Sequence, residues 1–340
     1  MPSKKLTCFL FNDLEPWERA GVEPIIENLC EYAIIETIWV TESQRRFFKI
    51  KPQGDFWIVA RDWQRALDFL AAKYYSSGKI FVSILHSKSE EKKMYGLSFK
   101  SIFSPLGKAI TLIVYSPLEY RFFKEIKKIP EAQLKLSSLA IGKTKPQINQ
   151  TSSTGKFQVG TFCDFSTESN INFLIGISHF ITNQTSQVHF NILGRGPLYS
   201  HFSKMLIELE LDHRVSIIET VSESTVGALD LFIYAPLRNH HFIPVLIAGA
   251  YKVPVISIDV PGIEEFIITG ESGIVMPSND IKLMGEKIIQ MLHSKEMRQT
   301  MGAKLQTHIE NIASPSTVSR SYRDLFFQES EKDLPIELAA

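Results

Sequence analysis

Short apolar runs recur along the whole chain and alternate with stretches whose apolar residues follow helical spacing. Apolar runs of this kind are typical of buried parallel strands. In the first half the pattern predicts strands at residues 6–11, 33–40, 55–60, 79–85, 110–115 and 136–141, and helices at 21–32, 63–75 and 118–129. Strands separated by helices are typical of a doubly wound α/β domain.

A polar break follows at residues 142–156, which contain Pro, Ser and Thr without an apolar period and therefore indicate a linker. A second α/β series then begins, with strands predicted at 157–160, 188–193, 215–219, 231–235 and 253–258 and helices at 170–182, 198–211, 245–251 and 282–293. A tail helix at 316–328 has an apolar stripe at helical spacing, formed by Val318, Tyr322, Leu325 and Phe326.

The segment 231–258 is the clearest unit of the second series. An apolar strand, a polar loop, a helix that opens at Pro244 and a second apolar strand together form a βαβ unit. Ligands of such units bind at the carboxyl ends of the strands, beside the amino ends of helices. The loops 236–243 and 259–265 should therefore share one crevice.

Composition narrows the class of protein. The chain has 340 residues, enough for two domains, and its 37 basic residues balance 37 acidic ones. That balance argues against a general nucleic-acid binder, which would carry a basic excess. Cys8, Cys30 and Cys163 have neither metal-ligand spacing nor the even number of a disulfide framework, which favours a reducing compartment. The sequence contains no apolar run long enough for a membrane span or a signal peptide, so we predict a cytoplasmic protein.

The segment 236–273 resembles the donor-side signature of family-4 retaining glycosyltransferases, which have the GT-B fold. That signature runs P-S-x-x-E-G-F-G-x-P-x-x-E-A-x-A-x-G-x-P-V-I, followed by G-G-x-x-E and G-x-x-G. The matching residues in this chain are Pro236, Phe242, Pro244, Val245, Leu246, Ala248, Ala250, Pro254, Val255, Ile256, Gly262, Glu265, Gly270 and Gly273. The resemblance implies an α/β protein of GT-B architecture, with two Rossmann-like doubly wound domains facing each other across a cleft.

The resemblance also implies a division of the chain. An acceptor-side domain is expected at residues 1–148, a linker at 149–156 and a donor-side domain for the nucleotide-sugar at 157–315. In this family the chain end crosses back, so the terminal helix within 316–340 is expected to pack on the first domain.

Shorter matches extend the resemblance beyond this segment. The loop 194–197 resembles the family's G-x-G-P donor loop. Residues 20–23 resemble its G-G-x-E acceptor-side loop, with Gly21 and Glu23 at the matching positions. His86 stands at a strand end that in this family often carries a histidine near the transferred sugar.

The family's charged side chains are absent from the matching positions of this sequence. The two glutamates of the signature fall on Asn239 and Ile247, or the first of them falls on His240. Thr161 stands where the family places a phosphate-binding arginine. The resemblance therefore leaves His86, Asn239 and His240 as the catalytic candidates.

Sugar transfer from a nucleotide diphosphate builds negative charge on the leaving group, which cations and the amino ends of helices stabilise. In this chain the backbone amides of Val245 and Leu246 remain at the helix start. Arg195 and Arg238, with the two loop histidines, could replace the lost positive charge. The expected donor-binding residues are Gly194, Arg195, Gly196, Arg238, Val245, Leu246, Gly262 and Glu265.

Each candidate also has an ordinary structural interpretation. Loop arginines and histidines are usually solvated, and a histidine such as His86 can simply end a strand. Glu23 and Glu265 can be acids that the helix dipole favours in a first turn. The 194–197 loop can be a plain strand-to-helix turn.

Two hypotheses therefore remain open. The first is a glycosyltransferase that moves a sugar from a nucleotide-sugar co-substrate to a glycan, lipid-linked or protein acceptor, without a metal or another cofactor. The second is a catalytically inactive relative that keeps the fold as a binding or assembly partner. Basic and aromatic residues mix at 45–51 and 120–128, which fits either peripheral contact with an anionic membrane or a half-buried element with a solvated basic face.

Overall fold

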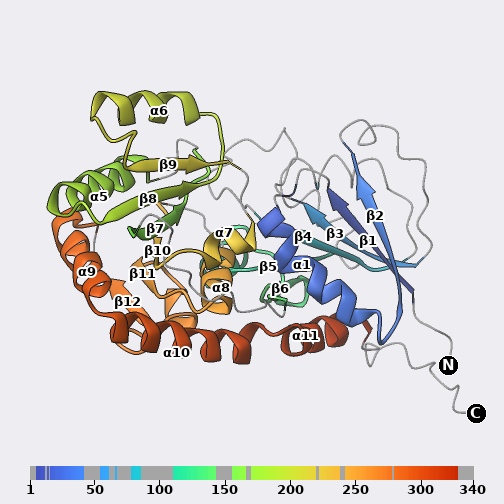
Figure 1. Ribbon diagram of the computed structural model, residues 1–340. Helices are drawn as coiled ribbons and strands as arrows, with labels where there is room; N and C mark the ends of the chain where they lie inside the picture. Colours follow the sequence, from blue (N-terminus) through green and yellow to red (C-terminus); the bar gives the residue numbers. More distant parts are fainter. Residues whose placement is uncertain are drawn as a thin grey trace, which may run out of the picture.

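The structure, a computed structural model, describes residues 5–11, 14, 16–41, 54–60, 66, 78–85, 110–142, 155–165, 170–219, 222–237, 242–277 and 279–327. These residues form two parallel sheets, each covered by helices (Figure 1). The strand order is β2-β1-β3-β4-β5-β6 in the first sheet and β12-β11-β10-β7-β8-β9 in the second. This topology confirms the predicted doubly wound α/β architecture.

The first sheet is buried on both faces, as its continuous apolar strands predict. In β1, Leu6, Cys8 and Leu10 enter one apolar cluster, whereas Phe9 and Phe11 enter another on the opposite face. The elements of this region are β1 (Lys5–Phe11), α1 (Pro16–Leu29), β2 (Ile34–Val40), β3 (Asp55–Ala60), β4 (Ile80–Ile84), β5 (Ile110–Val114), α4 (Pro117–Arg121), the π-helix η2 (Phe122–Ile126), the 3-10 helix η3 (Glu131–Gln133) and β6 (Leu134–Leu136).

The second sheet is built in the same way and carries longer helices. Its elements are β7 (Phe157–Phe162), α5 (Ile171–Gln184), β8 (Val188–Leu193), α6 (Tyr199–Glu208), β9 (Val215–Ile218), α7 (Glu223–Gly227), β10 (Leu231–Tyr234), α8 (Ile243–Ala250), β11 (Val255–Ile258), the 3-10 helix η4 (Ile263–Glu265), β12 (Gly273–Met276), α9 (Ile281–His293), α10 (Lys295–Ala313) and α11 (Pro315–Phe327). The first of the two apolar clusters continues from the first sheet into this region, so the two parts share packed residues.

The last two helices join the parts of the molecule. In Figure 1, α10 runs along the second sheet, and α11 continues from it to the first sheet and lies beside α1. The ring of Tyr322 lies 5.1 Å from that of Trp57, and the ring of Phe326 lies 4.6 Å from that of Phe81. The chain end is therefore anchored on the first sheet by buried aromatic rings.

Three elements differ from the predicted ones. Helix α1 begins at Pro16 instead of residue 21, because proline suits a first helical turn. The helix predicted at 118–129 is the short α4 followed by a π-helical turn. Instead of the strand predicted at 136–141, residues 137–142 follow β6 without regular structure.

After Ser137, whose amide still donates to the Val114 carbonyl of β5, the backbone of this last segment is bonded to helices, which explains the difference. The Ala140 amide donates to the Gly21 carbonyl at 3.0 Å, and the Ile141 amide donates to the Ala313 carbonyl at 2.9 Å. The helix predicted at 63–75 lies largely outside the described residues. Elements α7, β12 and α10 were not predicted, although the buried Met301, Leu305, Ile309 and Ala313 of α10 recur at helical spacing.

Candidate functional site

The topological switch point of the second sheet lies between β7 and β10, where the strand order reverses direction. In open parallel sheets, ligands bind at such a point, at the carboxyl ends of the strands. Thr161 pairs with Ile233 near these ends. The loops after β7, β8 and β10 are therefore the candidate site, and two of them contain residues predicted from the sequence.

The loop after β8 fits closely against the loop after β7 through two glycines. Gly194 has a φ of +140°, and a side chain there would overlap the carbonyl oxygen of Cys163. A side chain at Gly196 would overlap the carbonyl oxygen of Asp164. The glycines are thus required by contact between the two loops, whatever ligand they also approach.

Buried aromatic packing fixes the same pair of loops. Phe165 is fully buried, and its ring lies 5.3 Å from that of Phe202 in α6. It adopts a φ of 47°, which is unusual for a residue with a bulky side chain. The Leu198 amide donates to the Phe165 carbonyl at 2.8 Å, so the start of α6 is tied to the β7 loop.

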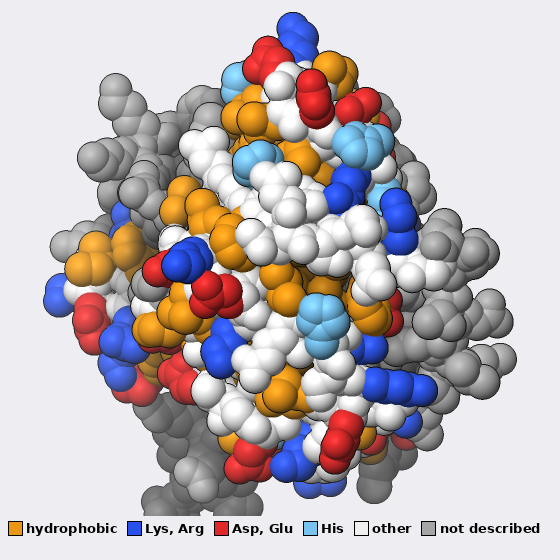
Figure 2. Space-filling view, turned by 60° about the vertical axis from the view of Figure 1, so that its left-hand side comes forward, with side chains coloured by type: hydrophobic (Ala, Val, Ile, Leu, Met, Phe, Trp, Pro, Cys, Tyr) orange, Lys and Arg blue, Asp and Glu red, His pale blue; other side chains and the backbone are white. Residues whose placement is uncertain are grey.

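The charges of these two loops are few and mixed. Arg195 and Asp164 are exposed in neighbouring loops. Thr161, at the family's arginine position, is 1% exposed, and its hydroxyl lies 3.4 Å from the carbonyl oxygen of Phe162. The described part of these loops therefore lacks a cluster of basic side chains. Figure 2 shows the side of the molecule that lies at the left in Figure 1, where acidic and basic side chains are also interspersed.

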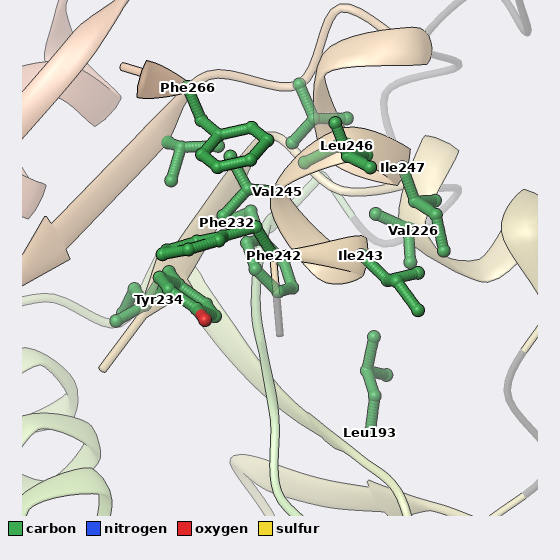
Figure 3. Close-up of a cluster of buried hydrophobic side chains, with 14 of the residues drawn as sticks. Leu193, Val226, Phe232, Tyr234, Phe242, Ile243, Val245, Leu246, Ile247 and Phe266 are labelled. Atoms are coloured by element: carbon green, nitrogen blue, oxygen red, sulfur yellow. The ribbon is translucent and has the colours of Figure 1, made fainter. Parts of the chain in front are cut away.

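The first turn of α8 closes the site at the end of β10. Pro244 stands in that turn, and the side chains of Val245 and Leu246 are buried with their neighbours in the apolar cluster of Figure 3. The Leu246 amide donates to the Phe242 carbonyl at 2.9 Å and is already used by the helix. The Val245 amide belongs to the first turn, where helix amides lack an intrahelical acceptor.

The loop after β11 meets this turn, as the sequence predicts. Gly262 has a φ of +93°, and a side chain there would lie 3.3 Å from the ring of Phe242 and 3.0 Å from Pro117 of the first domain. The ring of Phe242 also stacks on that of Phe266 at 4.4 Å. The absence of a side chain at Gly262 thus allows the loop after β11 to pack closely against the α8 turn and against Pro117 at the start of α4.

Glu265 follows Gly262 but lines a pocket between the domains together with Tyr115, Ser137 and Ser138. Partial burial, and to a smaller extent the neighbouring Glu264, raises the pKa of the Glu265 carboxyl. Its backbone carbonyl oxygen lies 2.7 Å from His308 Nε2. The described contacts of Glu265 therefore place it at the domain junction.

The predicted acceptor-side residues do not lie in a loop. Gly21 and Glu23 are inside α1, where Gly21 is buried and Glu23 is half-buried. An added side chain at Gly21 would lie 3.3 Å from Leu139 and 3.4 Å from Ile243 of α8. The helix starts earlier than predicted, and Gly21 allows close packing between α1 and α8. The acceptor-side role of Gly21 and Glu23 stays a prediction.

Four predicted residues lie outside the described part of the chain: His86, Arg238, Asn239 and His240. The segment 45–51 also lies outside it. Ile247, at the second glutamate position, is fully buried, and Figure 3 shows it beside Val226. An isoleucine buried there cannot accept a hydrogen bond from a ribose hydroxyl.

A buried polar chain at the domain junction was not indicated by the sequence. Trp57 Nε1 donates to Ser83 Oγ at 2.7 Å, Ser83 bonds to Tyr115, and the Tyr322 hydroxyl donates to the Tyr115 hydroxyl at 3.2 Å. Burial raises the pKa of Tyr115 to about 12. Trp57 and Ser83 within apolar strands are the available signal, because buried polar atoms need partners.

The second basic and aromatic segment forms η2 and its flanks. Lys124 Nζ lies 3.2 Å from Glu131 Oε1 and 5.6 Å from the ring centroid of Tyr120. Lys127 Nζ lies 5.2 Å from the ring centroid of Phe122. These lysines therefore cover aromatic rings of their own segment.

No helix in the described ranges is long and apolar enough to cross a membrane. Within the same ranges, no three His, Cys, Asp or Glu side chains gather as a metal site would require. The expectation of a reaction without a metal stays a prediction.

Comparison with known proteins assigns the second half of the chain. Residues 146–308 match the family model of the glycosyl transferases group 1. The uncharacterized glycosyltransferase MJ1178 of Methanocaldococcus jannaschii is 28% identical over 118 residues, which are 34% of this chain and 33% of that protein. The capsular polysaccharide biosynthesis glycosyltransferase CapM of Staphylococcus aureus is 30% identical over 123 residues, 34% of this chain and 32% of that protein. The matched stretch spans about a third of the length of both relatives.

Solved structures resemble the chain over most of its length. HepE of Anabaena, solved with UDP-glucose, superposes with a TM-score of 0.73 at 12% identity and covers 95% of this chain and 99% of HepE. TarM of S. aureus superposes with a TM-score of 0.64 at 17% identity, over 80% of this chain and 55% of TarM. At these identities the likeness concerns the fold. The chain therefore has the GT-B fold of these structures, and its residues 146–308 resemble the glycosyl transferases group 1 family.

Proposed function

We propose that the chain binds a nucleoside-diphosphate sugar at the carboxyl edge of the second sheet and transfers the sugar to a glycan, lipid-linked or protein acceptor. The observation that carries this proposal is the position of the switch point. It lies between β7 and β10, inside the region that matches the glycosyl transferases group 1 family. HepE was solved with UDP-glucose, and GtfA, the pneumococcal O-GlcNAc transferase, with UDP and GlcNAc, which supports a uridine nucleotide as the first donor to test.

The diphosphate would lie at the first turn of α8. The Val245 amide and the positive end of the helix dipole face negative charge there, as in other phosphate sites. Arg195 reaches this edge from the loop after β8 and supplies a charge-assisted hydrogen bond. Gly194 and Gly196 hold that loop against the β7 loop, so Arg195 is presented from a fixed backbone.

The leaving diphosphate gains negative charge as the glycosidic bond breaks. Preorganised donors at the α8 turn and the Arg195 guanidinium would stabilise that charge more than the bound ground state, which is the requirement for catalysis. Arg238, Asn239, His240 and His86 stay predicted contributors.

A second candidate is a catalytically inactive binding or assembly partner. Two buried residues, Thr161 and Ile247, favour this candidate. They stand where the resembling family has a phosphate-binding arginine and the second glutamate of its signature. Loss of a charged hydrogen-bond donor from such a site lowers rates by about a hundredfold or more. One neighbouring structure is the GtfA/B complex, so chains of this fold occur in assemblies.

Calorimetric titration with UDP, GDP, UDP-glucose and GDP-mannose tests the proposal. We expect heat with at least one uridine ligand and about tenfold weaker binding in Arg195→Ala, which corresponds to about 1.4 kcal/mol. The control is Arg320→Ala, which removes an exposed arginine from α11. Absence of heat with every nucleotide at millimolar concentration would contradict the donor site. Capture of a partner protein would then be the matching test of the second candidate.

We also propose that the segment around η2 touches an anionic membrane that carries the acceptor. Ile126 is 67% exposed there, beside the basic residues Arg121, Lys124 and Lys128. Insertion of the Ile126 side chain would add to the attraction between basic residues and the anionic surface, which contributes about 1 kcal/mol of binding free energy for each residue. The resulting contact is weak and sensitive to salt. Flotation with phosphatidylserine vesicles should carry the wild type but not Ile126→Glu, and equal recovery of both would contradict the contact. A cytoplasmic location stays a prediction from the scattered cysteines.

A further inference from the structure

A pocket of about 230 Å³ lies where the two domains and α11 meet. The first domain lines it with Tyr115, Ser137 and Ser138, the second domain with Glu265, and α11 with Ser321. Among the described residues that line it, none belongs to the loops after β7, β8 or β10. The pocket therefore lies outside these three loops, although Glu265 is also one of the residues predicted to bind the donor.

Three polar groups in this pocket have no hydrogen-bond partner within the described residues: the Glu265 carboxylate and the hydroxyls of Ser138 and Ser321. They come from three separate elements, so no single loop brings them together. By contrast, Tyr115 is already bonded to Tyr322 at 3.2 Å. The free groups are thus available to a ligand that bridges both domains.

The size of the pocket limits that ligand. The pocket volume is about 230 Å³. Pockets for larger ligands commonly have volumes of about 300–1,000 Å³. One sugar ring or a similar polyol fits this space, whereas a nucleotide-sugar does not.

The chemistry of the walls selects hydroxyl groups. A carboxylate only accepts hydrogen bonds, and serine hydroxyls both donate and accept them. A vicinal diol complements this set, because two of its hydroxyls donate to the carboxylate while its oxygens accept from the serines. Phe266 also lines the pocket and offers an apolar surface to the carbon face of a ring.

We propose that this pocket binds one neutral monosaccharide or polyol between Glu265, Ser138 and Ser321, as a site separate from the donor site. The raised pKa of Glu265 supports the assignment, because its charge lacks a compensating cation in the described surroundings. A ligand held there touches both domains and α11, and it stabilises the folded arrangement by mass action.

Titration with glucose, myo-inositol and glucosamine at millimolar concentration tests the site on the full chain. We expect binding of glucose or myo-inositol, weakened about tenfold in Glu265→Gln and in Ser138→Ala. The matched control, Glu310→Gln, makes the same change at an exposed position of α10 and should leave the affinity unchanged. Circular dichroism confirms that each variant is folded.

Three results would overturn the proposal. They are the absence of binding by glucose and myo-inositol, an affinity that is unchanged in Glu265→Gln, and a preference of more than about tenfold for glucosamine, which would indicate an ammonium site. The titration is repeated with UDP present. Competition by UDP would also overturn the proposal, because it would place the sugar in the donor site. Sugar binding combined with no binding of UDP itself would retain this site and refute the donor site.

Discussion

The loops of the second sheet and the junction of the two domains use polar groups in opposite ways. In the loops, Gly194 and Gly196 fit backbone against backbone, and few charged side chains are present. At the junction, Ser83, Tyr115 and Tyr322 are buried polar side chains bonded to one another. The comparison teaches that the candidate donor loops of this chain are held by backbone fit, whereas its buried polar side chains are concentrated where α11 anchors the domains.

The largest expected effect tests the junction. Tyr322→Ala removes the ring that packs at 5.1 Å from Trp57 and leaves the Tyr115 hydroxyl without its donor. We expect a loss of about 3–5 kcal/mol in the free energy of unfolding. Tyr322→Phe keeps the ring and should cost about 1 kcal/mol. Urea unfolding measures both, and a loss below about 1 kcal/mol for Tyr322→Ala would show that α11 is not anchored by this ring.

The next effect tests the loops. Gly196→Ala forces a shift against the Asp164 carbonyl oxygen and should cost about 1–3 kcal/mol while abolishing the heat of UDP binding. Gly270→Ala is the control, since it has a φ of +82° but no atoms within 4 Å of the added carbon. The control should lose about 1 kcal/mol from backbone strain and keep nucleotide binding. If Gly196→Ala still binds UDP, the close fit of the two loops is not required for the donor site.

Burial at the sheet edge gives a smaller, pH-dependent effect. Desolvation, and then the charges of Lys156 and Arg214, lowers the pKa of His189, which lies 2.8 Å from Ser216 Oγ. The folded state therefore binds fewer protons than the unfolded state, so this contribution is present above the ordinary histidine pKa and is lost as the pH falls through the folded value. Between pH 7.5 and 5, the wild type should lose slightly more stability than His189→Gln, because solvent screens this half-exposed side chain and keeps the effect below about 0.5 kcal/mol. Equal losses in both proteins would contradict this interpretation.

The smallest effect concerns Glu265, whose pKa is raised by partial burial and then by Glu264. A raised carboxyl pKa means that this stability contribution is present below the unfolded value and is lost as the pH rises through the folded value. Glu265→Gln should therefore stabilise the chain slightly at pH 7, since solvent screens this exposed carboxyl, and the gain should shrink at pH 4. Thermal unfolding at both pH values measures this difference, with Glu310→Gln as the control. A gain that is independent of pH would contradict the assigned cause.

Most of the fold follows from the sequence pattern, because strands buried on both faces appear as apolar runs. The stripe of the tail helix also predicted the buried Val318, Tyr322 and Phe326. Helix α10 was not predicted, although its buried Met301, Leu305, Ile309 and Ala313 recur at helical spacing. The early start of α1 was not predicted either, because residues 12–19 contain several polar residues that also suit a loop.

The candidate site could be predicted only in part. Local spacing identifies Gly194 and Gly262, because a turn requires a conformation that glycine adopts. The true partners of Gly21 and Glu265 depend on how the two domains pack together, and spacing along the chain carries no such information. Leu246 shows a third limit, since the helix itself uses the amide that the motif suggested for a ligand.

Amide hydrogen exchange with and without UDP tests the central claim, that a nucleotide binds at the carboxyl edge of the second sheet. The account predicts slower exchange at residues 194–198 and 242–246 when UDP is present, with little change in α11. Unchanged exchange at both loops under saturating UDP, or protection confined to the first domain, would contradict it.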